Sequence, residues 1–201
     1  MGPTRPRPAA RPARSRPRNS TFAPPPDLSA PKLTADGLLL RPWELADAEA
    51  LEPACGDPDV CRFTTVPERY SADAARAWIE RQHGRLAEGG VVLAIVPETV
   101  GRPVGMVGLF GLNRSDRTPR FGYWVIREFR GRGLAVTAAR ALGRWAADEL
   151  GIETLVLDVE PANEASHRVA AKLGAGRVGE VTQGTVRLAR YELAAGRLTR
   201  T

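Results

Sequence analysis

Hydrophobic residues along the chain gather into short blocks, and these blocks predict an alternation of strands and helices. Apolar runs rich in β-branched or aromatic residues and bounded by Gly or Pro are typical of buried strands. They predict strands at 38–40, 91–96, 104–109, 121–126 and 154–159, followed by two more near 177–181 and 186–193. Segments rich in Ala, Leu and charged residues predict helices at 44–54, 71–87, 134–150 and 164–173.

Residues with strong local preferences mark the ends of these elements. Ser71 is a good cap for the second helix, and Gly174 is placed to end the last one. Residues 56–59 (GDPD) and 101–103 (GRP) predict turns. The resulting order, β-α-α-β-β-β-α-β-α-β-β, places hairpins first and a strand–helix–strand unit at the centre. It predicts a single α/β domain with a mixed, mostly antiparallel sheet flanked by helices.

Residues 1–31 differ in composition from the rest of the chain. They hold nine of the 17 prolines and almost no large apolar residues. Such a segment buries too little surface to offset its chain entropy, so we expect a disordered extension at 1–31 and a folded domain at 32–201. Residues 1–30 also carry six arginines and one aspartate, which accounts for most of the net charge of +6. Because the rest is nearly neutral, no nucleic-acid surface is expected there. The extension itself is expected to be dispensable, and an arm that binds nucleic acid or an acidic partner is the alternative.

Other classes of protein are disfavoured by what the chain contains. The sequence holds no run of 18 apolar residues, so no membrane partner is expected. The N-terminal region lacks the apolar segment of a secretory signal. Cys55 and Cys61, with histidines far away at His83 and His167, match no zinc spacing, so we expect no metal. Unpaired thiols and no export signal favour a reducing cytoplasm.

The stretch 127–135, REFRGRGLA, joins a predicted strand to a predicted helix with little more than bare backbone and positive charge. Gly131 and Gly133 let the backbone approach a ligand closely, and the first N–H groups of the helix lack intrahelical partners. A phosphate or pyrophosphate fits such a place, with Arg130 and Arg132 adding positive charge. A tight glycine turn with solvated arginines fits the loop equally well. A dinucleotide fingerprint G-x-G-x-x-G would need glycine at 136, where Val136 stands.

Residues 130–135 (RGRGLA) also fit the pattern Q/R-x-x-G-x-G/A, and here the chain resembles the GNAT-type N-acyltransferases. The residues FGYW at 121–124 are similar to the strand that carries the thioester in that family. Residues 158–174 (DVEPANEASHRVAAKLG) are similar to a second family segment, and residues 38–63 resemble the branch of ribosomal-protein N-terminal acetyltransferases. The resemblance covers about 32–193 with the elements in the same order.

The resemblance implies a GNAT-like domain in which strand 121–126 splays from the next strand, and acetyl-CoA as co-substrate in that gap. Asn163 would contact the CoA arm, and Ser166 would protonate the leaving thiolate, with Tyr123 and His167 as the alternative acids. Asn163 is equally suited to cap a helix. The remaining cofactor contacts implied are Trp124, Val125 and Ile126 on the strand, backbone N–H groups of Arg130, Gly131, Arg132, Gly133, Leu134 and Ala135 at the pyrophosphate, and the hydroxyl of Thr137.

The expected reaction is direct transfer of an acetyl group to a primary amine within a ternary complex. The amine would belong to a protein N-terminus or a small molecule. We expect the protein to be a monomer or a homodimer. Many relatives carry an acidic residue just before the strand at 121, where this chain has Thr118, Pro119 and Arg120. Many also read T-E-A after the loop, where residues 136–138 are VTA. The base is therefore open. The alternative is a non-catalytic GNAT-like module that binds an acyl-CoA or a partner and carries a basic nucleic-acid arm.

Overall fold

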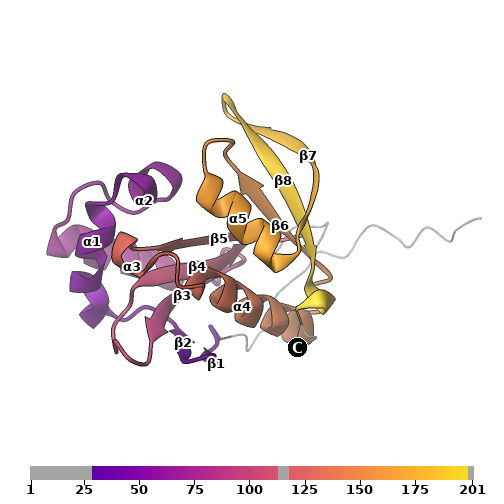
Figure 1. Ribbon diagram of the computed structural model, residues 1–201. Helices are drawn as coiled ribbons and strands as arrows, with labels where there is room; N and C mark the ends of the chain where they lie inside the picture. The colour runs from indigo at the N-terminus through magenta and orange to yellow at the C-terminus, as the bar shows by residue number, and fades with distance from the viewer. Residues whose placement is uncertain (1–28, 113–117, 199–201) are drawn as a thin grey trace, which may run out of the picture.

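One mixed sheet forms the centre of the molecule. The computed structural model describes residues 29–112 and 118–198. In these residues the sheet has eight strands in the order β1-β2-β3-β4-β5-β6-β8-β7 (Figure 1). Neighbouring strands are antiparallel except for β5 and β6, which are parallel. The strands are β1 Leu33–Ala35, β2 Leu38–Arg41, β3 Gly90–Pro97, β4 Gly105–Phe110, β5 Arg120–Val125, β6 Thr154–Val159, β7 Gly176–Gln183 and β8 Val186–Ala194.

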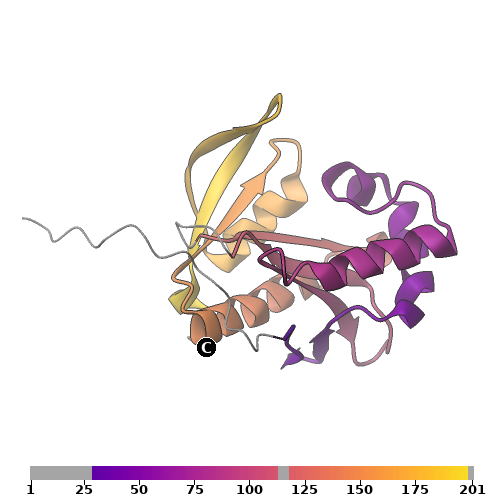
Figure 2. The ribbon, with the colours of Figure 1, turned by 180° about the vertical axis from the view of Figure 1, so that it is seen from behind.

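Helices cover both faces of this sheet. Helix α3 lies on one face, and α4 and α5 lie on the other (Figures 1 and 2). None of the helices in the described part of the chain is long and apolar enough to cross a membrane. The helices are η1 Leu45–Leu51, α1 Glu52–Cys55, α2 Pro58–Phe63, α3 Ala72–Gly84, η2 Arg127–Phe129, α4 Leu134–Leu150, α5 Glu164–Leu173 and η3 Ala195–Arg197, of which the three η elements are 3-10 turns.

The core lies between the sheet and these helices. Every residue of β3 is buried, as expected for a central strand covered on both faces. On the α3 side, Trp43, Trp78 and Trp124 form an aromatic cluster with ring centroids 5.1 to 6.3 Å apart. Tryptophans that pack at such distances bury large apolar areas, so this cluster holds β5 against α3 and the segment before η1.

Strands β5 and β6 pair only where β5 begins. Arg120 opposite Val156 is the one bridge between them, and the Val156 N–H donates to the Pro119 carbonyl at 3.0 Å. Asp158, whose side chain is only 7% exposed, accepts two hydrogen bonds from Arg190 on β8, and Arg120 lies 3.2 Å from it. These contacts hold the strands together at one end and leave them apart toward their C-terminal ends. The expected splaying of the central strand pair is confirmed.

Most predicted elements are confirmed, and the differences cluster near the N-terminus. The predicted helix 44–54 is a 3-10 turn followed by the short α1, because Pro53 has no N–H to continue a longer helix. The predicted turn at 56–59 is the start of α2, since Asp57 accepts from the Asp59 N–H at 3.1 Å and caps that helix. Helix α3 ends at Gly84 instead of near Ala87. Strand β1 was not predicted. Of the expected extension at 1–31, residues 1–28 lie outside the described residues.

Candidate active site

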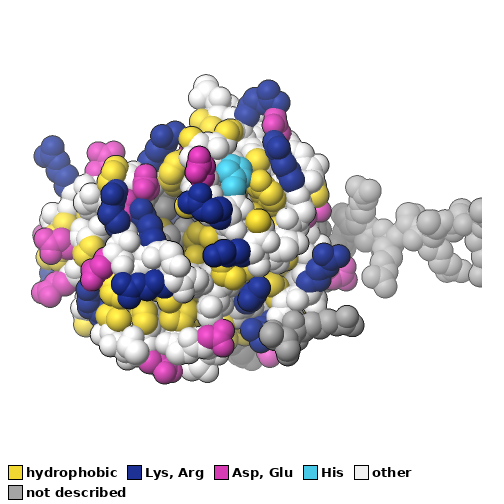
Figure 3. Space-filling model, in the orientation of Figure 1, with side chains coloured by type: hydrophobic (Ala, Val, Ile, Leu, Met, Phe, Trp, Pro, Cys, Tyr) yellow, Lys and Arg dark blue, Asp and Glu magenta, His cyan; other side chains and the backbone are white. Residues whose placement is uncertain are grey.

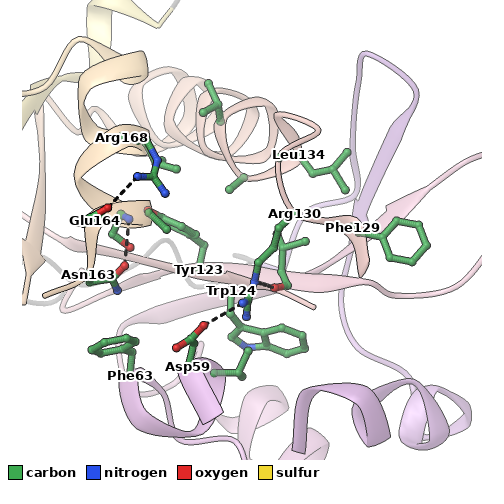
Figure 4. A pocket seen from close by; sticks show the side chains of 18 of the residues that line it. Asp59, Phe63, Tyr123, Trp124, Phe129, Arg130, Leu134, Asn163, Glu164 and Arg168 are labelled. Carbon is green, nitrogen blue, oxygen red and sulfur yellow. Dashed lines mark hydrogen bonds and ion pairs between the residues drawn. The ribbon is translucent and has the colours of Figure 1, made fainter. Parts of the chain in front are cut away.

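A cavity of about 520 Å³ opens where β5 and β6 part. Its walls come from the C-terminal half of β5, the loop before α4, the first turn of α4, and helices α5 and α2 (Figure 4). In the space-filling view the same region is a hollow with several Lys and Arg side chains around it (Figure 3). An open strand edge, a helix N-terminus and basic side chains therefore meet in one space.

The backbone of β5 presents alternate amides to this cavity. Ile126 donates its N–H to the Val104 carbonyl at 2.9 Å, and Trp124 stands opposite Met106 in the same ladder. Because the two sides of a strand alternate, the N–H of Val125 points the other way, toward the gap beside β6. Val125 and Trp124 line the cavity, whereas Ile126 is buried outside it and its amide is already bonded. The strand therefore offers the amide of Val125, where a ligand could pair like a strand.

The loop before α4 exposes backbone rather than side chains. Gly131 and Gly133 have φ values of +78° and +81°, a region that favours glycine, and a Cβ built on either would meet nothing within 4 Å. Gly133 is the N-cap of α4, so the N–H groups of Leu134 and Ala135 begin the helix without intrahelical partners. Loop and helix start form a concave set of donors at a positive helix end, which suits a pyrophosphate.

The two arginines of this loop are engaged within the protein. Arg130 bonds to the Val125 carbonyl at 2.9 Å and to the carboxylates of Asp57 and Asp59 at 2.7 and 3.1 Å. Arg132 lies over the Phe129 ring at 4.8 Å and donates to the Glu128 carbonyl. These contacts hold the shape of the loop, and the expected role of both arginines in adding positive charge beside a phosphate stays a prediction.

Helix α5 supplies the opposite wall. Asn163 accepts the Ser166 N–H at 3.0 Å, so its side chain caps α5, as one of its two expected roles requires. Ser166, one turn into the helix, lines the cavity. Arg168 and Lys172 follow on the same wall, and neither was predicted from the sequence. Their spacing of four residues was the available signal, since it puts both on one helix face.

Tyr123 reaches the cavity from β5, on the side opposite Trp124 (Figure 4). Burial raises the pKa of its hydroxyl from an ordinary value of 10 to about 12, because the charged form loses its hydration. The Ser166 hydroxyl is close enough to lower this pKa in part, although the two hydroxyls do not reach good hydrogen-bond geometry. A phenol with this pKa is protonated throughout the neutral range and is a hydrogen-bond donor.

The structure brings together nine of the twelve residues expected at the site: Trp124, Val125, Arg130, Gly131, Gly133, Leu134, Ala135, Asn163 and Ser166. Ile126, Arg132 and Thr137 do not line the cavity. His167 lies outside it as well, with its Nδ1 2.8 Å from the Tyr191 hydroxyl on β8. The wall formed by α2, which includes Asp59 and Phe63, was not predicted either, because the sequence predicted a turn there.

The site thus combines a parted strand pair with a glycine loop at a helix N-terminus. Comparison of the sequence with known protein families agrees with this arrangement. The family model described as "Acetyltransferase (GNAT) domain" matches residues 37–176. The chain belongs to the GNAT acetyltransferase family. It is therefore an acetyl-CoA-dependent N-acetyltransferase, and the matched segment contains every residue of the cavity described above.

Individual relatives point the same way. A putative ribosomal N-acetyltransferase, YdaF, from Bacillus subtilis is 31% identical over 84 residues, which is 42% of this chain but only 46% of that relative. Spermidine N(1)-acetyltransferase from Escherichia coli K12 is 27% identical over 74% of this chain and 77% of its own length. The structure of Mycobacterium smegmatis RimJ in complex with CoA-disulfide superimposes with a TM-score of 0.69 at 17% identity, over 85% of this chain and 89% of that one, which shows a common fold.

Proposed function

We propose that this enzyme transfers an acetyl group from acetyl-CoA to a primary amine of a protein N-terminus or a small molecule, by direct attack within a ternary complex. The observation that carries the proposal is the continuity of one cavity from the β5–β6 gap to the start of α4. A ligand lying in that cavity would have one end at the loop amides and the other at the open strand edge. An amine could then reach the same point from the side of α2.

The residues present fit acetyl-CoA. The pyrophosphate would lie against the amides of residues 131–135, where bare backbone and the helix dipole favour negative charge. The pantetheine arm would lie along β5 and accept from the Val125 N–H. Arg168 and Lys172 stand on the wall of the same cavity and would add positive charge beside the phosphates. Trp124 would form part of the apolar floor beneath the arm.

The chemistry required of the protein is modest. The amine nitrogen attacks the thioester carbonyl carbon, the C–S bond breaks, and the sulfur leaves as a thiolate. The amine loses one proton to water, and the sulfur gains one, for which Ser166 is the proposed donor. Holding the two reactants in line is itself a large part of catalysis, and an N–H at the carbonyl oxygen stabilises the developing charge. No acidic residue before β5 is needed if water accepts the amine's proton.

The described activities of the relatives are consistent with both kinds of acceptor, protein N-termini and small-molecule amines. One relative is described as a ribosomal N-acetyltransferase and another as a spermidine acetyltransferase. A direct test measures thiol release from acetyl-CoA by the full chain with two sets of acceptors: peptides with free N-termini and polyamines. We expect release with at least one set and acetylated acceptor by mass spectrometry. Tight acetyl-CoA binding with no release for any amine would favour the non-catalytic alternative instead.

A further inference from the structure

The Tyr123 hydroxyl is a buried polar group that makes no well-formed hydrogen bond within the described part of the chain. Its oxygen is shielded from solvent and has no hydrogen bond of good geometry to the described residues. An unsatisfied buried hydroxyl destabilises the folded state, so native proteins rarely keep one without a reason. The residue lines the cavity assigned above to acetyl-CoA, and its side chain points to the α5 side of the gap (Figure 4). A hydrogen bond that forms only in the working complex would supply the reason.

Ser166 is the group that can complete this contact. It lines the same cavity as Tyr123 and lies near enough to the Tyr123 hydroxyl to oppose the rise in the pKa of that hydroxyl. The Asn163 side chain holds its N–H at 3.0 Å, which fixes the backbone from which the serine side chain projects. A serine hydroxyl can accept one hydrogen bond while it donates another. Catalytic hydrogen bonds are often long before substrate binds and tighten in the complex.

We propose that Tyr123 is a positioning residue that donates its hydroxyl hydrogen to Ser166 Oγ, so that the Ser166 hydrogen points at the sulfur leaving acetyl-CoA. This inference rests on the proposed function. As the C–S bond breaks, its electron pair goes to the sulfur, and the sulfur takes the Ser166 proton. Water, which has taken up the proton lost by the amine, returns a proton to Ser166 Oγ. Tyr123 stays protonated throughout and stabilises the negative charge that develops on Ser166 Oγ, because a hydrogen bond to a charged form favours it.

The test compares Tyr123→Phe with wild type and with Tyr191→Phe. Tyr191 is a matched control, because its hydroxyl also contacts α5, through His167, but lies outside the cavity. We expect Tyr123→Phe to lower kcat by roughly 10- to 100-fold, the loss of one hydrogen bond to a developing charge, with the affinity for acetyl-CoA unchanged. Without ligand, Tyr123→Phe should melt at the same or a higher temperature, because it removes an unsatisfied group. Tyr191→Phe should keep kcat.

The double variant Tyr123→Phe/Ser166→Ala decides whether the two hydroxyls act as a unit. Residues that act as a unit give grossly non-additive losses, so we expect the double variant to be no slower than Ser166→Ala alone. Fully additive losses, an unchanged kcat in Tyr123→Phe, or a weakened affinity for acetyl-CoA at normal kcat would each overturn the inference. A lowered melting temperature of Tyr123→Phe would also overturn it, by showing a structural hydroxyl. A wild type that releases no thiol would instead overturn the proposed function.

Discussion

Arg130 and Tyr123 show how much of this site depends on single side chains. Arg130 joins three parts of the protein: its own loop, the end of β5 and the N-terminus of α2. The sequence identified Arg130 as part of the phosphate loop but not the direction of its side chain. That direction depends on Asp57, which is distant in sequence. It also depends on helix α2, which begins where residues 56–59 (GDPD) predicted a turn.

The burial of Tyr123 predicts a pH effect on stability. Its pKa is about 12 in the folded protein and about 10 when unfolded, so between these values the unfolded chain loses a proton that the folded chain keeps. Burial of the protonated Tyr123 hydroxyl therefore does not lower the free energy of unfolding below pH 10. The free energy of unfolding falls as pH rises from 10 toward 12. By pH 11.5 the free energy of unfolding should have fallen by about 2 kcal/mol more in wild type than in Tyr123→Phe.

Urea unfolding of both proteins at pH 9 and pH 11.5 measures this difference. Tyr70 and Tyr191 are present in both proteins, so their ionisation cancels. Equal losses of stability in the two proteins would show that the Tyr123 hydroxyl is not buried as described.

At the scale of elements, the sequence predicted best what local preferences decide. Helix α4 begins and ends at glycines with left-handed backbone, and both its ends were predicted. Helix α5 and strand β6 were likewise predicted with their bounds. The segment from η1 to α2 was predicted poorly, because prolines at 53 and 58 can either break a helix or start one. Only the contacts of Asp57 decide between these outcomes.

The joint between α2 and the phosphate loop should therefore affect both stability and cofactor binding. Asp57, with a side chain 3% exposed, holds both the Asp59 N–H and the Arg130 guanidinium. Asp57→Ala should lower the free energy of unfolding by roughly 2 kcal/mol and weaken acetyl-CoA binding, because the loop loses an anchor. Asp59→Ala is the matched control: its carboxylate also contacts Arg130 but is 61% exposed, so a change below about 1 kcal/mol is expected.

Chemical denaturation and calorimetric titration with acetyl-CoA measure the two effects in each variant. If Asp57→Ala and Asp59→Ala behaved alike, the buried carboxylate would have no special part in holding the loop.

At the scale of the whole molecule, the fold could be predicted because the order of elements is distinctive, and the splayed strands followed from the family resemblance. What could not be predicted is which side chains face the cavity. Arg168 and Lys172 do so because α5 is packed in one rotation against the sheet, which no local pattern sets. Ile126 does not, because its amide completes the β4–β5 ladder.

That the N-terminal extension takes no part in the folded domain remains a prediction. Ala30 packs against the core, and β1 begins at Leu33, so a shortened chain should start at Ser29. Because residues 1–28 are poor in large apolar side chains, we expect the shortened chain to keep its melting temperature and its affinity for acetyl-CoA. Differential scanning calorimetry of the shortened chain and the full chain compares their melting temperatures, and titration with acetyl-CoA compares their affinities. A fall of many degrees would show that the extension docks on the domain.

If the pyrophosphate of acetyl-CoA lies against the backbone at Gly133, a negative charge placed there should repel it, and calorimetric titration of a matched pair of variants measures this. Gly133→Asp and Gly133→Asn place side chains of nearly equal size at the same left-handed position, which both residues tolerate better than most, so their cost to folding is similar. They differ in one negative charge. We expect Gly133→Asp to lose acetyl-CoA binding far more than Gly133→Asn, with equal melting temperatures. Equal affinities in the two variants would contradict it.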